Sequence, residues 1–472
     1  MKILDIAPDS KTVADLIKVL KNRSTVAPDV EKLKKQLDPK QHDIHDPGFR
    51  PDKIVKSNKG TKTVKVARVA VALQNKIIGL GAAFAFGNPV KLNAEIEKGR
   101  KDLKLLLASL KKVLKKNKTK SLDRRIYKLI SSYTEVAEYW YMVPVEGNEV
   151  FKGYGFDSKF KIRVSVFSPK DGTKLYPIWD ETGDFVRFSR EFTRNDAQGK
   201  PVEYFETFTN EERVLWKKSQ GDTDWNEHSK STFIYKKMPV VYGDQEQVDY
   251  YDVEDLIKEV ETLLSNFDDT IAYHAWPKIF VNGKIVGLSE KGETGGIIEG
   301  GPQTEAKYLS WDHAPESVKL SLETKLRFIN TLTSTPDISM ESMKSIGAES
   351  GFARKMLFME PHLKVADKEE IYIPYMERRY SIIKTLLGEM NPSFKKIIDE
   401  LDIDPELTPY MIDDAEDALN LMTIATGGKP ILSQKTAISK SGIVEDAEAE
   451  YELIQDEDKA SKTLDVYGPP VE

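Results

Sequence analysis

The spacing of apolar and polar positions changes several times along the chain. Residues 150–242 alternate apolar and polar positions between short turns, which predicts an antiparallel meander of strands. Residues 62–86 are apolar and rich in small residues, and we expect one helix that ends at Gly87. Residues 91–140 repeat leucines at three- and four-residue spacing, so we expect helices there, with Leu103, Leu106, Leu107, Leu110 and Leu114 on one face. Residues 1–60 give only two short helical patterns, and we expect them to be poorly packed.

Two long helices are predicted to bracket a small insert. Residues 251–271 carry the clearest stripe, which consists of Val253, Leu256, Ile257, Val260, Leu263, Leu264, Phe267 and Ile271. The second helix is expected to begin near Ala314, before a proline that suits a first turn, and to stop at Pro336. The insert between them, residues 277–312, contains strand-like sequence (KIFVNGKIVGL) and a glycine-rich stretch.

The C-terminal part is predicted to be mostly helical. Residues 351–390 indicate helical segments that are interrupted at Pro361 and Pro374, because proline removes a backbone donor. The last 80 or so residues are helical in pattern and acidic.

Composition excludes several classes of protein. The chain has 472 residues, of which 40% are apolar and 31% charged, with a mean hydropathy of −0.46. It can bury a sizeable core, and its length suggests about three domains. No apolar run is long enough to span a membrane, and no secretory signal is expected at the N-terminus. The absence of cysteine excludes disulfides, thiolate zinc sites, iron–sulfur clusters and cysteine nucleophiles.

Charge is distributed unevenly around a net value of −6, which argues against a generally basic, DNA-holding surface. Residues 98–120 contain ten Lys or Arg and one acid, whereas 399–417 contain nine acids and 444–458 eight, both without a base. Each run is most simply a solvated face, but such asymmetry also suits a protein with different partners on different faces. The basic run lacks aromatic residues, so it suits duplex backbone or an acidic protein surface rather than stacked bases.

No motif supports catalysis. A phosphate loop is absent: Gly60-Thr61-Lys62-Thr63 lacks its leading glycine, and Pro430 replaces the required hydroxyl after Gly427-Gly428-Lys429. We interpret the glycine-rich stretch 292–301 as a loop. His42 and His45, with their neighbouring aspartates, could ligate a metal, but a surface turn is the simpler interpretation. His274 is expected to pack or hydrogen-bond near a helix end. We therefore expect no enzyme activity, metal or cofactor.

The order of several short motifs resembles the portal proteins of tailed bacteriophages, which form the head-to-tail connector. Each motif alone is weak, and the similarity covers roughly residues 60–455. The motifs are Phe86-Gly87-Asn88-Pro89-Val90, Pro177-Ile178-Trp179-Asp180, 202–217, Met238-Pro239-Val240-Val241-Tyr242 before the helix at 251–271, Thr335-Pro336-Asp337-Ile338-Ser339, Ser350-Gly351-Phe352-Ala353, Asp417-Ala418-Leu419-Asn420, 431–436 and 444–450.

The resemblance implies a portal-type α+β subunit with a mixed α/β wing, a two-helix stem, a small α/β clip and a helical crown. On this basis we divide the chain as follows: a partly ordered arm, 1–60; wing, 61–245; first stem helix, 246–276; clip, 277–312; second stem helix, 313–334; tunnel loop, 335–350; wing helix segments, 351–390; crown, 391–455; and an acidic tail with expected disorder, 456–472.

The resemblance also implies a function and partners. Portal subunits form a ring, typically a dodecamer, at one capsid vertex, and double-stranded DNA passes through it during packaging and ejection. Expected partners are the terminase large subunit, adaptor or neck proteins and the major capsid protein, without a membrane. We expect assembly in the bacterial host cytoplasm and a final location in the virion.

Two groups of site residues follow from that resemblance. The tunnel loop would contact DNA in the channel through Ser339, Met340, Glu341, Ser342, Met343, Lys344 and Ser345. The clip would dock the terminase or an adaptor through Lys284, Glu290, Lys291 and Glu293. The tunnel loop has a single base, Lys344, among several acids, which suits it to sliding contact with DNA rather than to sequence readout.

The charge is consistent with a conduit for DNA. Twelve copies at −6 each would give a ring of −72, and net repulsion should let a duplex slide. A closed ring needs two unlike faces per subunit, for which the basic run 98–120 and the acidic run 399–417 are candidates. The alternatives are another structural or interaction protein of the virion and, less well supported, a DNA-processing packaging enzyme.

Overall fold

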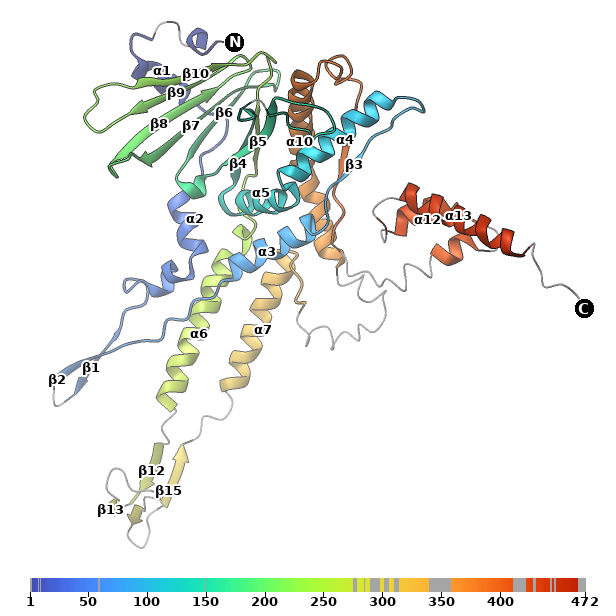
Figure 1. Ribbon diagram of the computed structural model, residues 1–472. Helices are drawn as coiled ribbons and strands as arrows, with labels where there is room; N and C mark the ends of the chain where they lie inside the picture. Colours follow the sequence, from blue (N-terminus) through green and yellow to red (C-terminus); the bar gives the residue numbers. More distant parts are fainter. Residues whose placement is uncertain are drawn as a thin grey trace, which may run out of the picture. The chain divides into compact units, whose positions relative to one another are not determined.

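The computed structural model forms two compact units (Figure 1). The first consists of Met1–Pro336 and Glu360–Tyr410, and the second of Asp337–Met359 and Met411–Glu472. The structure describes residues 2–6, 8, 10–57, 60–147, 149–274, 278–283, 285–288, 298–300, 305–309, 314–338, 358–410, 422–427, 430–441, 444 and 447–465.

Two antiparallel sheets form the β part of the first unit. The larger has the order β10-β9-β8-β7-β6 and the smaller β11-β4-β5. The meander predicted for 150–242 is confirmed, but β4 corrects the expectation of helix up to residue 140. The strands are β4 (Glu135–Pro144), β5 (Phe160–Phe167), β6 (Lys174–Trp179), β7 (Phe185–Asn195), β8 (Pro201–Phe208), β9 (Glu212–Lys218), β10 (Asn226–Thr232) and β11 (Val240–Asp244).

The two sheets share an aromatic core. Inward residues from both sheets pack in one cluster, and the Phe188 and Phe208 rings lie 6.1 Å apart. Arg190 lies over the ring of Phe167 at 3.6 Å and pairs with the buried Glu206 at 2.5 Å. The alternation visible in the sequence therefore arises because one face of each strand is buried.

The N-terminal residues contradict the expectation of poor packing. Helix α1 (Val13–Leu20) follows the short 3-10 helix η1 (Ile3–Ile6), and together they cover one face of the larger sheet. The apolar side of α1 is buried against Phe205 and Trp216. The next elements are α2 (Val30–Leu37), the 3-10 helices η2 (Pro39–Gln41) and η3 (Asp43–His45), and the hairpin of β1 (Lys53–Ser57) and β2 (Gly60–Val64).

Four helices surround the smaller sheet and the elements that follow it. They are α3 (Leu73–Phe86), α4 (Lys101–Lys116), α5 (Thr119–Tyr133) and α10 (Met359–Met390). The helix predicted for 62–86 begins only at Leu73. The interruption predicted at Pro374 is also wrong, because α10 continues through it, and Pro361 lies in the first turn of α10, which tolerates proline. Further elements are η4 (Pro169–Asp171) and the strand pair β3 (Lys91–Asn93) with β16 (Asp404–Glu406).

The predicted helix–insert–helix arrangement is present. After η5 (Tyr251–Val253), α6 (Glu254–His274) leads to the insert, and α7 (Ala314–Leu332) returns beside α6 (Figure 1). The insert contains two strand pairs, β12 (Lys278–Asn282) with β15 (Glu305–Leu309) and β13 (Ile285–Leu288) with β14 (Ile298–Gly300).

In the second unit, α12 (Gln434–Ser441) packs with α13 (Ala447–Asp465). Lys435 pairs with Glu448 at 2.5 Å between them. Within the part of the chain that the structure describes, none of the helices has both the length and the apolar character required to cross a bilayer.

Candidate functional site

The α6–α7 pair forms the long axis of the candidate site. Lys325 of α7 pairs with Glu259 of α6 across the two antiparallel helices. Val260 on α6 and Ile329 on α7 are buried, whereas Leu320 and Phe328 of α7 are 67% and 50% exposed. Because α7 leaves part of its apolar surface exposed in one copy, the pair is suited to further packing in an assembly.

The extended segment 67–71, which precedes α3, binds along α6. The backbone N–H groups of Val71, Val69 and Ala67 donate to Glu261 Oε1 (2.9 Å), Ser265 Oγ (2.9 Å) and Asp269 Oδ1 (2.8 Å), respectively. The spacing of the donors matches that of the acceptors, because two extended residues advance about 6.6 Å and four helical residues advance about 6 Å. These bonds replace the ladder that a strand would otherwise need.

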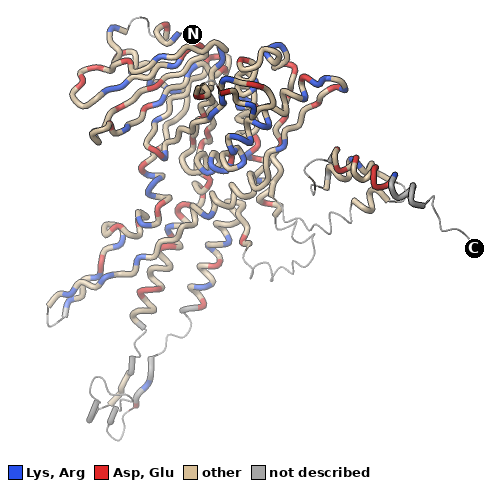
Figure 2. The backbone as a smooth tube through the Cα atoms, in the orientation of Figure 1, with Lys and Arg blue, Asp and Glu red and all other residues tan. Residues whose placement is uncertain are grey.

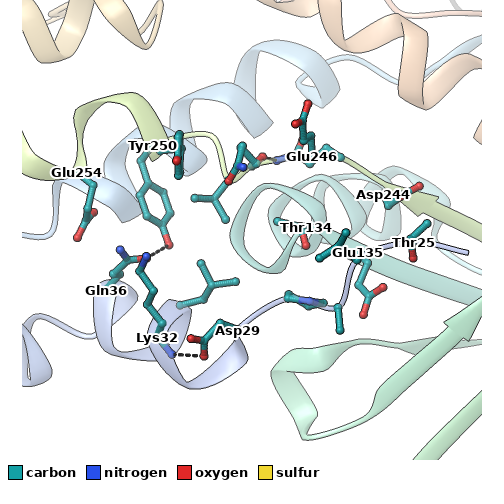
Figure 3. Close-up of a pocket in the computed structure, with 18 of the residues that line it drawn as sticks. Thr25, Asp29, Lys32, Gln36, Thr134, Glu135, Asp244, Glu246, Tyr250 and Glu254 are labelled. Atoms are coloured by element: carbon teal, nitrogen blue, oxygen red, sulfur yellow. Dashed lines mark hydrogen bonds between the residues drawn. The ribbon is translucent and has the colours of Figure 1, made fainter. Parts of the chain in front are cut away.

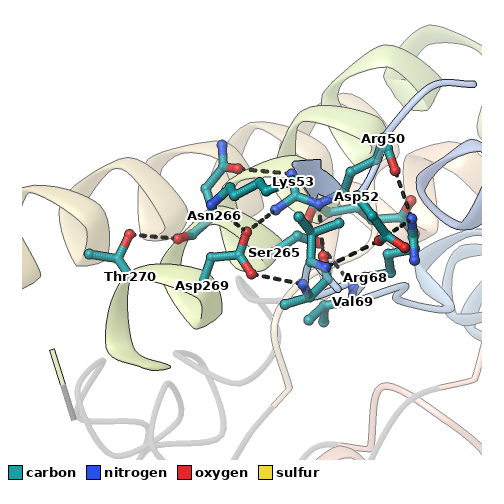
Figure 4. A network of polar contacts seen from close by, with 12 residues as sticks. Arg50, Asp52, Lys53, Arg68, Val69, Ser265, Asn266, Asp269 and Thr270 are labelled. Atoms are coloured by element: carbon teal, nitrogen blue, oxygen red, sulfur yellow. Dashed lines mark hydrogen bonds and ion pairs between the residues drawn. The ribbon is translucent and has the colours of Figure 1, made fainter. Parts of the chain in front are cut away.

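Charged groups anchor the outer end of this segment (Figure 4). Arg50 donates to Asp269 Oδ2 and Asn266 Oδ1, each at 2.9 Å, and to the carbonyl oxygen of Ala67 at 2.7 Å. Lys53 adds a 3.3 Å contact with Asp269. Burial would raise the pKa of Asp269, but the Ala67 N–H and the two cations outweigh it and lower the pKa. The β1–β2 hairpin is therefore fixed at its base to α6.

His42 anchors the other end of the segment 67–71, because it contacts the same Glu261 oxygen as the Val71 N–H group. Its Nδ1 lies 2.6 Å from Glu261 Oε1, and its Nε2 lies 2.9 Å from the carbonyl oxygen of Gln36. Both partners accept hydrogen bonds, so the arrangement favours the doubly protonated imidazolium. Burial would lower the pKa of His42, but the Glu261 carboxylate outweighs it and raises the pKa. The surface turn expected at 42–46 is present as η3, yet His42 itself is buried.

Lys364 of α10 links the end of α7 to the buried carboxylate of Asp249. Lys364 donates to the Thr333 carbonyl at 3.0 Å and lies 3.6 Å from Asp249, and Lys368 binds Asp249 at 2.8 Å. Burial would raise the pKa of Asp249, but the two ammonium groups lower it to about 2. This cluster therefore holds the end of α7 to α10.

A cavity of about 890 Å³ lies between residues 24–36 and the start of α6 (Figure 3). Its lining is mainly acidic, and Tyr250 reaches Gln36 at 3.4 Å across it. Burial raises the pKa of both Asp244 and Glu254. Its carboxylates are Asp29, Glu135, Asp244, Glu246, Asp252, Glu254 and Asp255, against Lys32 and Lys258.

Those carboxylates do not form a candidate metal site. Among the described residues, no group of three or more His, Asp or Glu is placed to hold a metal ion. Glu135 is already paired with Arg23 at 2.7 Å. Gly60–Thr63 lie in the exposed strand β2, and the next helix, α3, begins only at Leu73, so this segment is not followed directly by a phosphate-binding helix terminus.

The residues predicted from the resemblance lie outside the described part of the chain. For the tunnel loop these are Ser339, Met340, Glu341, Ser342, Met343, Lys344 and Ser345; for the clip they are Lys284, Glu290, Lys291 and Glu293. Both groups stay predictions. Sequence reasoning also missed Glu261, Ser265 and Asp269, although polar residues at four-residue spacing on one face of α6 were a visible signal.

One charge pairing corrects an expectation. Arg100, from the basic run, pairs with Glu400, from the acidic run, at 2.5 Å within the same chain. Lys91 likewise contacts Glu406 across the β3–β16 pair. Part of the charge complementarity that we expected between neighbouring copies is therefore satisfied within one copy.

The chain is similar to known proteins at two levels. The family model described as "Phage portal protein, SPP1 Gp6-like" matches residues 17–464. No curated protein matches. Among solved structures, the chain is similar at 10% identity to chains of the "Neck of empty GTA particle computed with C6 symmetry" (TM-score 0.39) and of the "Neck of native GTA particle computed with C12 symmetry" (0.38). In each case the alignment covers 79% of this chain and 89% of the other.

The match to the family model extends over nearly the whole chain, from the N-terminal helix α1 to the C-terminal helix α13. Portal proteins are structural components of a capsid vertex and not enzymes. The chain belongs to the SPP1 Gp6-like family of phage portal proteins.

Proposed function

We propose that the chain works as a homo-oligomeric ring, a dodecamer, at one vertex of a virion capsid. The ring is the conduit for double-stranded DNA during packaging and ejection, and it binds DNA without reading sequence. It assembles in the host cytoplasm, contacts the major capsid protein, and receives first the terminase large subunit and then adaptor or neck proteins. The family match over residues 17–464 carries this proposal.

The surfaces of the α6–α7 pair support assembly into a ring. A closed ring is a heterologous assembly in which each copy presents two unlike faces. The exposed Leu320 and Phe328 of α7 offer one apolar face, and the basic β1–β2 hairpin, fixed to α6 through Asp269, lies on another part of the same stem. Residues 42–71, which include the hairpin, are anchored to α6 at both ends. The hairpin surface is therefore preorganised, which reduces the entropic cost of association.

The assembly test is direct. Purified protein imaged by negative stain, with its mass measured over a range of salt concentrations, should show closed rings with a central hole. A Leu320→Glu, Phe328→Glu double variant should lower the ring fraction, whereas Val26→Glu, at an exposed apolar position of the arm, serves as the matched control. A strict monomer at every salt concentration, or an open filament, contradicts the proposal.

The docking and channel roles are tested in packaging reactions. Charge reversal at Lys284, Glu290, Lys291 and Glu293 should reduce motor docking while rings still form. Normal packaging after deletion of the loop 292–301 contradicts the clip assignment. Replacing Met343 or Lys344 should leave the ring intact and alter DNA packaging or retention. A ring structure with those residues on its outer surface contradicts the tunnel-loop assignment.

A further inference from the structure

Helices α4 and α5 form a strongly basic surface that the conduit function does not use (Figure 2). Their apolar stripes are buried, so the charged positions face outward. Between Lys101 and Lys128 the acids are Asp102, which pairs with Arg100, and Asp123, which is buried against Arg379. The exposed bases are Lys101, Lys104, Lys111, Lys112, Lys115, Lys116, Lys118, Lys120, Arg124, Arg125 and Lys128.

These bases are unpaired. None of those eleven side chains forms an ion pair with any residue that the structure describes, whereas Arg100 at the start of α4 contacts both Asp102 and Glu400. Like charges on one surface repel one another, and a bound polyanion relieves that repulsion. The pattern therefore indicates a ligand with many negative charges rather than one carboxylate.

The surface continues into a hollow. A cavity of about 870 Å³ lies between α2, α3, α5 and η4, and its lining has more bases than acids. Arg124 is held in place there by the carbonyl oxygens of Phe86 and Gly87, at 2.7 and 2.9 Å. The lining bases are Lys34, Arg124, Arg125, Lys128 and Lys170, against Asp38 and Asp171.

We infer that the α4–α5 surface binds the phosphate backbone of double-stranded DNA outside the channel. From Lys101 to Lys116, α4 is about 22 Å long at 1.5 Å per residue. A duplex presents about 13 phosphates over that length. The bases at 111–112 and 115–116 follow one another by one helical turn, so they form a row along α4. Without an aromatic side chain among the exposed positions of α4, this surface contacts backbone and not stacked bases.

A closed circular duplex separates this surface from the channel, because it cannot thread through a ring that is already closed. Assembled rings should retain closed circular DNA on filters at low salt, with no sequence preference and an affinity that falls steeply as salt increases. Each lysine that contacts a phosphate contributes about one unit to the slope of log affinity against log salt. This readout does not depend on packaging, so the conduit proposal can fail while the surface inference stands, and the reverse.

The decisive variant replaces Lys111, Lys112, Lys115 and Lys116 by Gln. Its matched control makes the same four-charge change near the larger sheet, at the exposed Lys11, Lys18, Lys200 and Lys236. We expect intact rings for both, a slope reduced by about two to four and at least a roughly tenfold loss of affinity in the α4 variant only. Unchanged binding by the α4 variant overturns the inference. Loss of rings in that variant also overturns it, because the surface would then be an interface with an acidic face of a second copy.

Discussion

Arg379 is the buried cation through which α10 is held to β4 and α5. Its guanidinium donates to both oxygens of Glu138, at 2.9 and 2.7 Å, and to Asp123 at 2.6 Å. All three residues are buried. Arg379→Met keeps much of the side-chain volume but leaves two carboxylates without their shared cation. Removing one partner of a buried ion pair costs about 3–5 kcal/mol. At about 2 °C per kcal/mol for a large domain, the Tm should fall by roughly 6–10 °C.

The loss should depend on pH. Burial already raises the pKa of Asp123 in the native protein, and removing Arg379 raises it further. A carboxyl whose pKa is higher in the folded than in the unfolded state favours folding as protons are added. The difference in Tm between the variant and the native protein should therefore be largest near pH 8 and shrink toward pH 5.

Thermal unfolding at one protein concentration measures both effects. Lys395→Gln is the control, since it breaks a surface pair with Glu389 in which the lysine is 60% exposed. That pair should contribute less than about 1 kcal/mol. A Tm for Arg379→Met within 2–3 °C of the native protein, or a deficit that does not change with pH, would refute the reasoning.

Three further predictions follow from the structure. Because the pKa of His42 is raised in the folded protein, its stabilisation of residues 42–71 is complete below pH 6.5 and is lost as pH rises through the folded-state pKa. Proteolysis within residues 42–71 of the native protein should therefore accelerate at higher pH. The His42→Gln variant should lose that pH dependence. Asp249→Asn removes the carboxylate that pairs with Lys364 and Lys368 and should cost about 3–5 kcal/mol in thermal unfolding, whereas Asp268→Asn on the exposed side of α6 should cost little. Purified protein free of terminase should show only background ATP hydrolysis, and robust turnover abolished by one substitution in this chain would contradict the absence of a phosphate loop.

The elements predicted correctly are those whose burial follows one local period. The stripe from Leu256 to Ile271 lies in α6, because residues three and four apart share a helical face; Ile257 and Val260 are buried, whereas Ile271 near the end of α6 is exposed. The alternation in 150–242 has the same local origin in strands, and the proline after Ala314 marks the first turn of α7. The motif order that identified the family also depends on sequence alone.

Tertiary contacts determine the conformation of segments whose sequence has no such hydrophobic period. Residues 67–71 are extended although their composition suits a helix, because Glu261, Ser265 and Asp269 accept their backbone N–H groups from about 190 to 200 positions away in the chain. His42 is buried for the same reason, because its partner Glu261 lies 219 positions away in the chain. Pro374 lies inside α10, where packing of the buried Tyr372 and Tyr375 on either side offsets the lost backbone hydrogen bond. A partner distant in sequence leaves no periodic trace near the residue that it fixes, so only the folded chain reveals it.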